Sequence, residues 1–459
     1  MKKWRNLAEK KWLRRMAACL FWLCVWQSVF LLADNKLLLA GPIQTAQALF
    51  CRIFTFAFWQ VTGMSLFRVL LGLFLAFFVG TLLGIAAFKS SLMKELLSPL
   101  MLFCKAVPVA SFAVILLIWW GSGWLSTAVI FPVVLPMVYV NIYEGLKSTD
   151  KKLLQMAKVF DMPLMNRIFY IHMPSLAPFM DGCIKTAVGM GIKAGVAAEV
   201  IGTPVWSVGG ELYLSKIYLD TAGVFAWTAV VIALGFALEK AVLFCWRSFC
   251  RRHPEPVKGR KKEAVPASIY TEDVVKSFGS HTVLCGISKK LEAGRIYCLT
   301  GVSGAGKTTL LHILAGLEKP GQGRVEIRAG ENFKSAISAA GMFQDDRLCE
   351  EESALVNVRL VSHDCKKAEE CLKELLPEEA FRQPVKNLSG GMRRRVCLAR
   401  ALTADADWLF LDEPFTALDE ENKQNAIHII KKYRQNKLTV LVTHDINDAA
   451  KLGGELWRI

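Results

Sequence analysis

The chain has 459 residues, a formal net charge of +16 at pH 7 and a hydrophobic fraction of 53%. This apolar content exceeds that of ordinary soluble domains and lies mostly before residue 247, so we expect that part of the chain in lipid. The basic residues cluster beside apolar stretches and form no amphipathic or aromatic-interleaved stripe, which argues against a nucleic-acid-binding protein and favours charges that orient a membrane domain.

Six stretches are apolar over the roughly 20 residues that a spanning helix needs. They are 16–33, 66–88, 98–120, 125–146, 178–200 and 222–246. The first follows a basic segment and has no small-residue cleavage site after it, which favours a signal anchor over a cleaved signal peptide. Loop 147–177 is rich in lysine and the external loops carry few basic residues, so the positive-inside rule places this loop and everything after residue 246 in the cytoplasm.

Composition divides the chain into a transmembrane domain (1–246), a basic, proline-containing linker (247–266) and a soluble domain (267–459). In the soluble part, short β-rich runs such as RIYCLTG and WLFLDEP alternate with helical stretches. That alternation predicts an α/β domain with a parallel sheet and crossover helices.

Residues 301–309, GVSGAGKTT, follow an apolar run and fit the phosphate-binding pattern G-x-x-x-x-G-K-[ST]. The glycines allow the backbone to approach phosphates closely, Lys307 is expected to reach the β and γ phosphates of ATP, and Thr308 is expected to bind Mg²⁺. The alternative, a chance glycine-rich turn, is much weaker after a predicted strand. The expected ATP-binding residues here are Gly301, Ser303, Gly304, Ala305, Gly306, Lys307, Thr308 and Thr309.

The run WLFLDEP places two carboxylates at the end of a predicted buried strand. Asp412 suits the Mg²⁺ site, and Glu413 suits a general base that polarises the attacking water. Alone, such a pair is usually only a strand end or a helix cap. Together with the phosphate-binding loop it predicts the second half of a nucleotide site.

Between these motifs lies LSGGM, residues 388–392, which resembles the LSGGQ signature of the ATP-binding cassette (ABC) family. The resemblance implies an α/β P-loop domain of ABC type in which Ser389, Gly390 and Gly391 contact the γ phosphate of ATP held by an opposing subunit. Met392 replaces the glutamine of the signature and removes a side-chain amide. Because one signature completes the phosphate site of another cassette, the resemblance implies a homodimer with two composite ATP sites.

Four further positions resemble landmarks of the same family. Phe278 matches the aromatic residue that stacks on adenine, and Gln344 matches the Q-loop glutamine that senses Mg²⁺ and the membrane domain. Asp419 matches the D-loop, and His444 matches the switch histidine. A lone residue of any of these types would more often be packing or surface, and it is their register with the three stronger motifs that favours function.

The cytoplasmic loop resembles the EAA loop of binding-protein-dependent importers over QMAKVFDMPLMNRIFYIHMP, residues 155–174. Ala157, Ile171 and Pro174 are in register, whereas Gln155 stands for glutamate and Asp161 for glycine. We expect an amphipathic helix that docks on the cassette near Gln344; the alternative is a surface helix between spans. Most of residues 64–246 resembles permeases of the nitrate, sulfonate and taurine importer group, which usually keep permease and ATPase on separate chains.

Three acids, Glu350, Glu351 and Glu352, stand where relatives are more apolar, and we expect them to face Lys158 and Arg167 of the coupling loop. Lys193 and Glu199 lie within or near the fifth apolar stretch, where an ionisable residue is costly and marks either a transport path or an internal pair. We expect Glu199 near the external interface. Lys193 could attract an anion or pair with another helix.

The resulting hypothesis is an ATP-driven importer in a bacterial inner membrane, with a cytoplasmic ATPase domain and about six spans. It would use ATP and Mg²⁺, contact lipid, bind no nucleic acid, and receive a small solute from an external substrate-binding protein. Nitrate, sulfonate or taurine-like anions are the solutes that the resemblance implies; a thiamine or pyrimidine precursor is the alternative. The rival functions are a half-exporter of hydrophobic compounds, which needs longer cytoplasmic helices, and a regulatory membrane ATPase that transports nothing.

Overall fold

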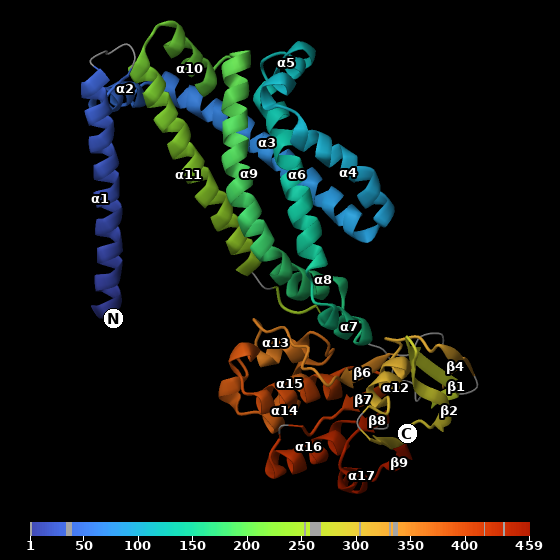
Figure 1. Ribbon diagram of the computed structural model, residues 1–459. Helices are drawn as coiled ribbons and strands as arrows, with labels where there is room; N and C mark the ends of the chain where they lie inside the picture. Colours follow the sequence, from blue (N-terminus) through green and yellow to red (C-terminus); the bar gives the residue numbers. More distant parts are fainter. Residues whose placement is uncertain are drawn as a thin grey trace. The chain divides into compact units, whose positions relative to one another are not determined.

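A computed structural model describes residues 2–33, 39–251, 254–257, 268–302, 304–329, 332–333, 338–416, 418–434 and 437–459. The chain forms two compact units, each described by itself (Figure 1). One unit contains residues 1–148 and 175–252, and the other contains residues 149–174 and 253–459. The loop between the fourth and fifth predicted spans therefore belongs to the same unit as the soluble domain.

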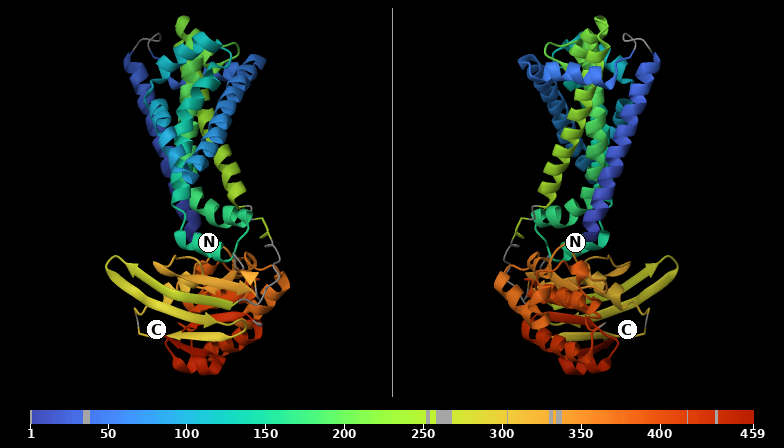
Figure 2. Two further views of the ribbon diagram at one scale, coloured as in Figure 1. Left: turned by 90° about the vertical axis from the view of Figure 1, so that its right-hand side faces the viewer. Right: turned by 90° about the vertical axis from the view of Figure 1, so that its left-hand side faces the viewer.

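The described residues of the first unit form helices and short connections, which Figure 2 shows from two further sides. The helices are α1 (Lys2–Ala33), α2 (Pro42–Ile53), α3 (Phe56–Lys89), α4 (Ser91–Ala106), α5 (Val109–Trp120), α6 (Leu125–Lys147), α9 (Met173–Gly202), α10 (Val208–Ile217) and α11 (Thr221–Arg251).

Helices α3 and α6 pack closely along their length because glycines of α3 face branched side chains of α6. A Cβ atom added to Gly80 would lie 2.8 Å from the Cβ of Val138, and one added to Gly84 would lie 2.7 Å from Cγ2 of Ile142. Small residues let helix backbones approach closely where lipid supplies no hydrophobic drive. This contact is the centre of the helical unit.

Of the six expected spans, the described residues support four or five by length and hydropathy. Among the described residues, four helices are long and apolar enough to cross a membrane: the Met16–Ala33 part of α1, α3, α6 and α11. The predicted span 178–200 lies on α9, which is long enough but carries Asp181, Lys185, Lys193 and Glu199. A typical span carries fewer charged residues, so α9 does not meet the composition of a span although it is as hydrophobic as α11.

The predicted span 98–120 is two helices, α4 and α5, bent by 100° at the break between them. Val107 and Pro108 both adopt extended backbone conformations at this point. Proline disfavours helical geometry in the residue before it, so the sequence Val107–Pro108 ends α4. Counted as one broken span, the pair gives the fifth crossing.

The second unit begins with the loop between α6 and α9. It contains α7 (Lys151–Val159), α8 (Leu164–Arg167) and a π-helical turn, Ile168–His172, that leads into α9. Asp150 caps α7 by accepting a hydrogen bond from the Lys152 N–H. Buried Met156, Ala157 and Ile171 belong to the same hydrophobic core as the soluble domain. The loop is therefore packed as part of that domain.

The soluble domain has two sheets. A parallel sheet in the order β6-β7-β8-β3-β9 contains β3 (Ile296–Thr300), β6 (Ala339–Met342), β7 (Trp408–Asp412), β8 (Leu438–Val442) and β9 (Glu455–Arg458). An antiparallel sheet in the order β2-β1-β4-β5 contains β1 (Ser268–Phe278), β2 (His281–Leu291), β4 (Gln322–Ala329) and β5 (Asn332–Phe333). Every residue of β7 and β8 is buried, as expected for parallel strands covered on both faces.

Helices surround the parallel sheet. They are α12 (Lys307–Leu314), α13 (Ala354–Arg359), α14 (Cys365–Leu375), α15 (Gly390–Thr403), α16 (Glu420–Tyr433) and α17 (Ile446–Leu452), with 3₁₀ turns at Glu378–Ala380 and Val385–Asn387. The α/β fold expected from the sequence is confirmed.

Candidate functional site

The motifs identified in the sequence follow parallel strands and meet at one edge of the sheet. The glycine-rich loop follows β3, Gln344 follows β6, Asp412 and Glu413 end β7, and His444 follows β8. The carboxyl ends of parallel strands lie at the same edge, where α/β domains bind ligands. The topology thus brings five predicted groups together.

The glycine-rich loop connects β3 to α12 through backbone conformations that side chains would obstruct. Gly304 has φ +85° and Gly306 has φ +87°, and a Cβ atom on Gly306 would lie 2.7 Å from Cγ1 of Val283. The Lys307 Nζ donates to the carbonyl oxygens of Gly301, at 2.9 Å, and Val302, at 2.8 Å. Lys307 therefore lies folded over the loop at the point where a phosphate would bind.

The other residues predicted in the glycine-rich loop differ in burial and in whether the structure describes them. Ala305, Thr308 and Thr309 are half-buried at the start of α12. Ser303 lies outside the described residues.

Asp412 is 1% exposed, and neither of its carboxylate oxygens makes a hydrogen bond of good geometry within the described part of the chain. Burial raises its pKa to about 6, and the neighbouring Thr308 hydroxyl opposes that rise. A buried carboxylate without partners carries a desolvation cost that a bound cation would offset.

Glu413 is held in a left-handed backbone conformation, φ +50°, which non-glycine residues seldom adopt. Its Oε1 lies 2.9 Å from Nε2 of His444, and its Oε2 accepts a hydrogen bond from Thr416 Oγ1 at 3.2 Å. These three side chains, with Thr443 and Asp445, line one pocket. The carboxylate is therefore oriented and opens into a cavity, as a general base needs.

The signature segment forms the amino-terminal end of α15. Ser389 is the N-cap residue and accepts a hydrogen bond from the Met392 N–H at 3.3 Å. Ser389 and Gly390 are exposed, and Gly391 is half-buried. The segment therefore presents backbone N–H groups at an accessible helix end.

The remaining landmarks lie on accessible surface. Phe278, at the end of β1, is 51% exposed with Lys276 Nζ 5.2 Å from its ring centroid. Gln344 is exposed, and its carbonyl oxygen accepts a hydrogen bond from Arg394. Asp419 is the N-cap residue of α16 and accepts from the Asn422 N–H at 2.8 Å, so it has a structural role that the sequence did not indicate.

Helix α7 of the coupling loop contacts the cassette at both of its ends. Lys152 forms an ion pair with Asp345 at 2.8 Å, beside Gln344, and Lys158 Nζ donates to the carbonyl oxygen of Gly316 at 3.2 Å. Asp161, which stands where the related loops have glycine, has φ +47°. Left-handed geometry explains why glycine suits this position, and aspartate is among the residues that tolerate it.

The other four coupling-loop residues differ in burial. Ala157 and Ile171 are buried in the shared core, Gln155 is half-buried, and Pro174 lies in the first turn of α9.

Asn166 ties the linker to the coupling loop, a contact that sequence analysis missed. Its side chain accepts from the Val257 N–H at 2.9 Å and donates to the carbonyl oxygens of Val257, at 2.9 Å, and Leu360, at 3.2 Å. Tyr170 donates its hydroxyl to the carbonyl oxygen of Pro254. Of the predicted linker, residues 252–253 and 258–266 lie outside the described residues.

Two of the three acids, Glu350 and Glu351, do not face the coupling loop as expected, whereas the Glu352 carboxylate interacts electrostatically with Tyr170 of that loop. Glu350 pairs with Arg393 at 3.3 Å and Glu351 pairs with Lys386 at 2.6 Å, both within the cassette. Glu352 is buried. Arg167 of the loop donates instead to the carbonyl oxygen of Ala157.

Within the helical unit, Glu199 is fully buried beside Arg68, with Nη1 and Oε1 3.7 Å apart. Its Oε2 accepts hydrogen bonds from Ser65 Oγ, at 2.8 Å, and the Gly209 N–H, at 3.2 Å. Of the two roles considered for Glu199, these contacts support the internal pair. Lys193, on the same helix, is exposed.

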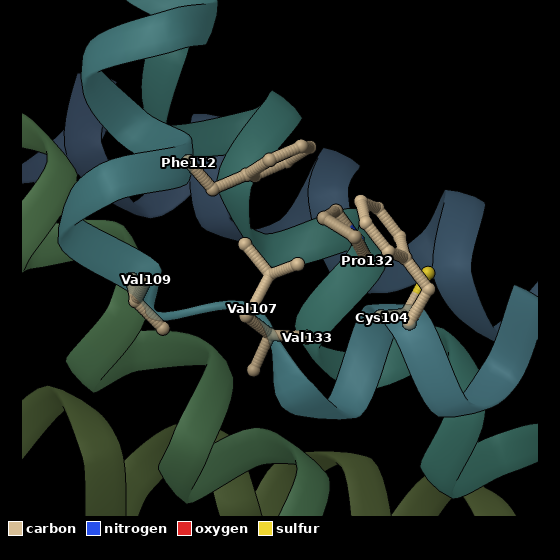
Figure 3. Close-up of a pocket in the computed structure, with 7 residues that line it drawn as sticks. Cys104, Val107, Val109, Phe112, Pro132 and Val133 are labelled. Atoms are coloured by element: carbon tan, nitrogen blue, oxygen red, sulfur yellow. The ribbon is translucent and has the colours of Figure 1, made fainter.

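An apolar pocket lies at the α4–α5 break, between Cys104, Val107, Val109, Phe112 and residues of α6 (Figure 3). Pro132 and Val133 form its α6 wall. Its lining offers no charged group. It marks the place where the broken helix packs against a continuous one.

The fold and site together define a P-loop ATPase joined to a helical membrane domain. Residues 284–416 match the family described as ABC transporter, and residues 69–242 match the family described as binding-protein-dependent transport system inner membrane component. The two matches cover the two predicted halves of the chain.

Similar curated proteins include aliphatic sulfonates import ATP-binding proteins. SsuB 1 of Rhizobium johnstonii is 37% identical over 198 residues, which is 41% of this chain and 72% of that protein. SsuB of Bacillus subtilis is 35% identical over 200 residues, 42% of this chain and 78% of that protein. A solved dimeric bacterial ABC transporter cassette aligns at 29% identity over 42% of this chain and 94% of that chain, with a TM-score of 0.38.

The chain belongs to the ABC transporter family. It joins an importer-type permease domain to an ATP-binding cassette, and it couples ATP hydrolysis to transport across a membrane that it crosses several times. The resemblance drawn from LSGGM and the coupling loop is thereby confirmed.

Proposed function

We propose that the chain imports a small anion of the sulfonate or nitrate type, delivered by an external substrate-binding protein, as a homodimer in a bacterial inner membrane with its cassettes in the cytoplasm. The observation that carries the proposal is the coupling loop, residues 149–174, whose side chains complete the core of the cassette. The resemblance of this loop to the EAA loop supports import, and the similarity of the cassette to aliphatic sulfonates import ATP-binding proteins supports an anionic solute.

In the hydrolysis step, Glu413 orients and polarises the attacking water while His444 and Thr416 hold its carboxylate. Lys307 reaches the β and γ phosphates once it exchanges its loop carbonyls for them. Phe278 offers an exposed ring on which adenine can stack.

The residues present fit a magnesium ion. Asp412 has two buried oxygens without good hydrogen bonds, the Thr308 hydroxyl lies beside it, and Gln344 offers an amide oxygen at the same sheet edge. Bound there, the ion would neutralise charge on the β and γ phosphates. The described residues contain no cluster of three or more His, Cys, Asp or Glu side chains suited to a metal, which agrees with a site completed by phosphate oxygens.

Accessible Ser389 and Gly390 support a homodimer, because an exposed helix terminus can meet the γ phosphate held by a second copy. In the membrane domain, exposed Lys193 of α9 supports anion passage, since an ionisable residue among membrane helices faces water or a partner far more often than lipid. ATP-driven closure of the two cassettes would pull the coupling loops together and switch the permease between two states.

The test is reconstitution in liposomes with ATP outside and solute-loaded candidate binding proteins inside. We expect a loaded sulfonate-type binding protein to stimulate both ATP hydrolysis and solute efflux into the ATP-containing bath, and Glu413→Gln to abolish both. Stimulation by lipophilic compounds, with no response to any binding protein, would replace import with export.

A further inference from the structure

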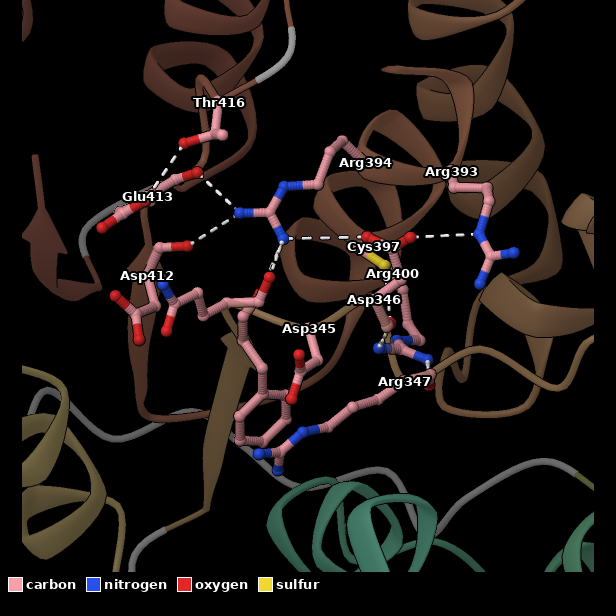
Figure 4. Close-up of polar contacts among 12 residues, drawn as sticks. Asp345, Asp346, Arg347, Arg393, Arg394, Cys397, Arg400, Asp412, Glu413 and Thr416 are labelled. Atoms are coloured by element: carbon pink, nitrogen blue, oxygen red, sulfur yellow. Dashed lines mark hydrogen bonds and ion pairs between the residues drawn. The ribbon is translucent and has the colours of Figure 1, made fainter. Parts of the chain in front are cut away.

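Arg394 is a buried arginine that joins two segments of the ATP site. From the second turn of α15, its Nη1 donates to the carbonyl oxygens of Phe343, at 2.9 Å, and Gln344, at 2.7 Å. Its Nη2 donates to the carbonyl oxygens of Asp412, at 3.2 Å, and Glu413, at 2.7 Å (Figure 4). One guanidinium thus binds four backbone carbonyls.

The two segments need such a bridge because they separate where their strands end. The pairing of β6 with β7 ends at Met342 and Leu411, although Asp412 still pairs with Val442 of β8. Buried carbonyls need a donor, and the planar fork of arginine offers several at fixed angles. A lysine ammonium cannot reach all four in the same geometry.

One end of the bridge is the acid that activates water. The left-handed backbone of Glu413 is fixed on both sides: its carbonyl by Arg394, and its N–H by the carbonyl oxygen of Val442 at 3.1 Å. Its carboxylate is held by His444 and Thr416. A strained backbone conformation persists only where neighbouring groups hold it. Arg394 supplies one of the hydrogen bonds that hold the backbone of Glu413.

The other end is the segment that meets the coupling loop. Lys152 pairs with Asp345, one residue from a carbonyl that Arg394 binds. The same segment is held to α15 by Arg400, which donates to the carbonyl oxygens of Arg347, at 2.7 Å, and Asp346, at 3.3 Å. A continuous set of contacts therefore runs from the coupling loop to the carboxylate of Glu413.

We propose that Arg394 is a positioning residue that sets the orientation of the Glu413 carboxylate according to the position of residues 343–345, and so links hydrolysis to the coupling loop. This inference rests on the proposed role of Glu413 as general base. Arg394 touches neither nucleotide nor water in this role. Its effect passes through the backbone of the residue that does.

The test is steady-state ATP hydrolysis by the purified full-length protein, normalised to the number of sites that bind a fluorescent ATP analogue. We expect Arg394→Gln to lower kcat about 30-fold with KM for ATP within about threefold of the original, because the lost interaction aligns a catalytic group rather than binding ATP. Arg394→Lys should recover part of the loss, since its ammonium donates up to about three hydrogen bonds.

Arg393→Gln is the matched control. Arg393 is the preceding residue on α15, and its partners are the side chains of Glu350 and Asp346, the second of which also lies 3.7 Å from Nη1 of Arg394. Arg393 binds none of the four carbonyls that Arg394 joins. We expect its kcat to stay within about threefold.

The outcomes separate this inference from the proposed function. If Glu413→Gln abolishes hydrolysis and Arg394→Gln keeps kcat within about threefold, the inference alone is overturned. If Glu413→Gln retains hydrolysis, the assignment of the general base is overturned and this inference with it. If Arg394→Gln misfolds and loses its ATP-binding sites, the Arg394→Lys variant becomes the test. A kcat of Arg394→Lys equal to that of the original protein would then overturn the inference.

Discussion

The ammonium group of Lys152 in the coupling loop lies 2.8 Å from the carboxylate of Asp345, the residue after Gln344. The pair lowers the pKa of Asp345, chiefly through the hydrogen bond from Lys152. Both side chains are about half exposed, 57% and 53%, so the pair is weak and sensitive to salt. It nevertheless connects the loop to the segment that Arg394 holds.

Reversing one charge of this pair should weaken coupling more than hydrolysis itself. We expect Lys152→Glu to lower the stimulation of ATP hydrolysis by a loaded binding protein about two- to fivefold, as suits an exposed pair, while unstimulated hydrolysis changes little. The double variant Lys152→Glu/Asp345→Lys should restore stimulation. Because the pKa of Asp345 is lowered, the contribution is present at neutral pH and disappears as pH falls through that pKa.

The left-handed conformation of Asp161 predicts a stability difference between two substitutions. A β-branched side chain is strained at φ +47°, so Asp161→Val should lower the free energy of unfolding by about 1–2 kcal/mol. The free energy of unfolding of Asp161→Gly should stay within about 1 kcal/mol of that of the original protein. Thermal unfolding in detergent measures both, and equal stability of the valine and glycine variants would contradict the assignment of strain.

Asp412 predicts two opposite effects of pH. Its pKa of about 6 means that the carboxyl is largely protonated at pH 5, so we expect Mg²⁺-dependent ATP affinity to fall as pH drops from 7 to 5. Without nucleotide, the folded-state pKa lies above the unfolded value, so this group stabilises the fold increasingly as pH falls from about 6 to about 4.

The isosteric variant Asp412→Asn should remove both effects. At pH 7 it should raise the free energy of unfolding of the nucleotide-free protein by about 2 kcal/mol, because an uncompensated buried charge is gone. It should also lose Mg²⁺-dependent ATP binding. ATP-binding titrations and thermal unfolding across this pH range measure the two results, and an asparagine variant that keeps the original pH dependence would exclude Asp412 as its source.

The buried pair Arg68–Glu199 predicts an asymmetry between its two partners. Arg68→Met leaves the buried carboxylate of Glu199 without its cation. We expect this variant to lower the free energy of unfolding by about 3–5 kcal/mol, which would be measured as a loss of folded protein in membranes. Glu199→Gln keeps an acceptor for Ser65 and Gly209 and should be milder. If Glu199 were instead a path residue, the glutamine variant would fold normally and lose transport, which an uptake assay would reveal.

The contacts of Asn166 predict protection of the linker. Asn166→Leu removes two hydrogen bonds to the backbone of Val257 and one to Leu360, so the rate of limited proteolysis after residue 252 should rise about tenfold. Asn166→Asp, which keeps the acceptor but loses the donors, should be intermediate. Unchanged proteolysis in both variants would show that the contact does not hold the linker.

Local sequence signals located much of the fold and site. The phosphate-binding pattern placed the loop after β3, and the acidic pair lies at the end of β7, because each motif is contiguous and follows a buried strand. The Val107–Pro108 step also carried a signal, since the residue before proline avoids helical geometry, but average hydropathy over 98–120 concealed the break.

Other features depend on contacts between distant segments. The four carbonyls that Arg394 binds are backbone groups, which every residue has, so no residue type or spacing in the sequence indicates these contacts. The same holds for Glu351, whose nearest cation is Lys386 in a 3₁₀ turn and not the coupling loop. The charge of a residue predicts the sign of the charge on its partner, but it does not predict where in the chain that partner lies.

The break between α4 and α5 bears on the lipid that surrounds the protein. Helices of 16 and 12 residues are about 24 Å and about 18 Å long, shorter than a hydrocarbon layer of about 30 Å. Neither half can match the bilayer thickness alone, so hydrophobic mismatch concentrates at this part of the permease. We therefore expect acyl-chain length to be a variable that the transporter senses here, with thinner bilayers easing the strain at the break.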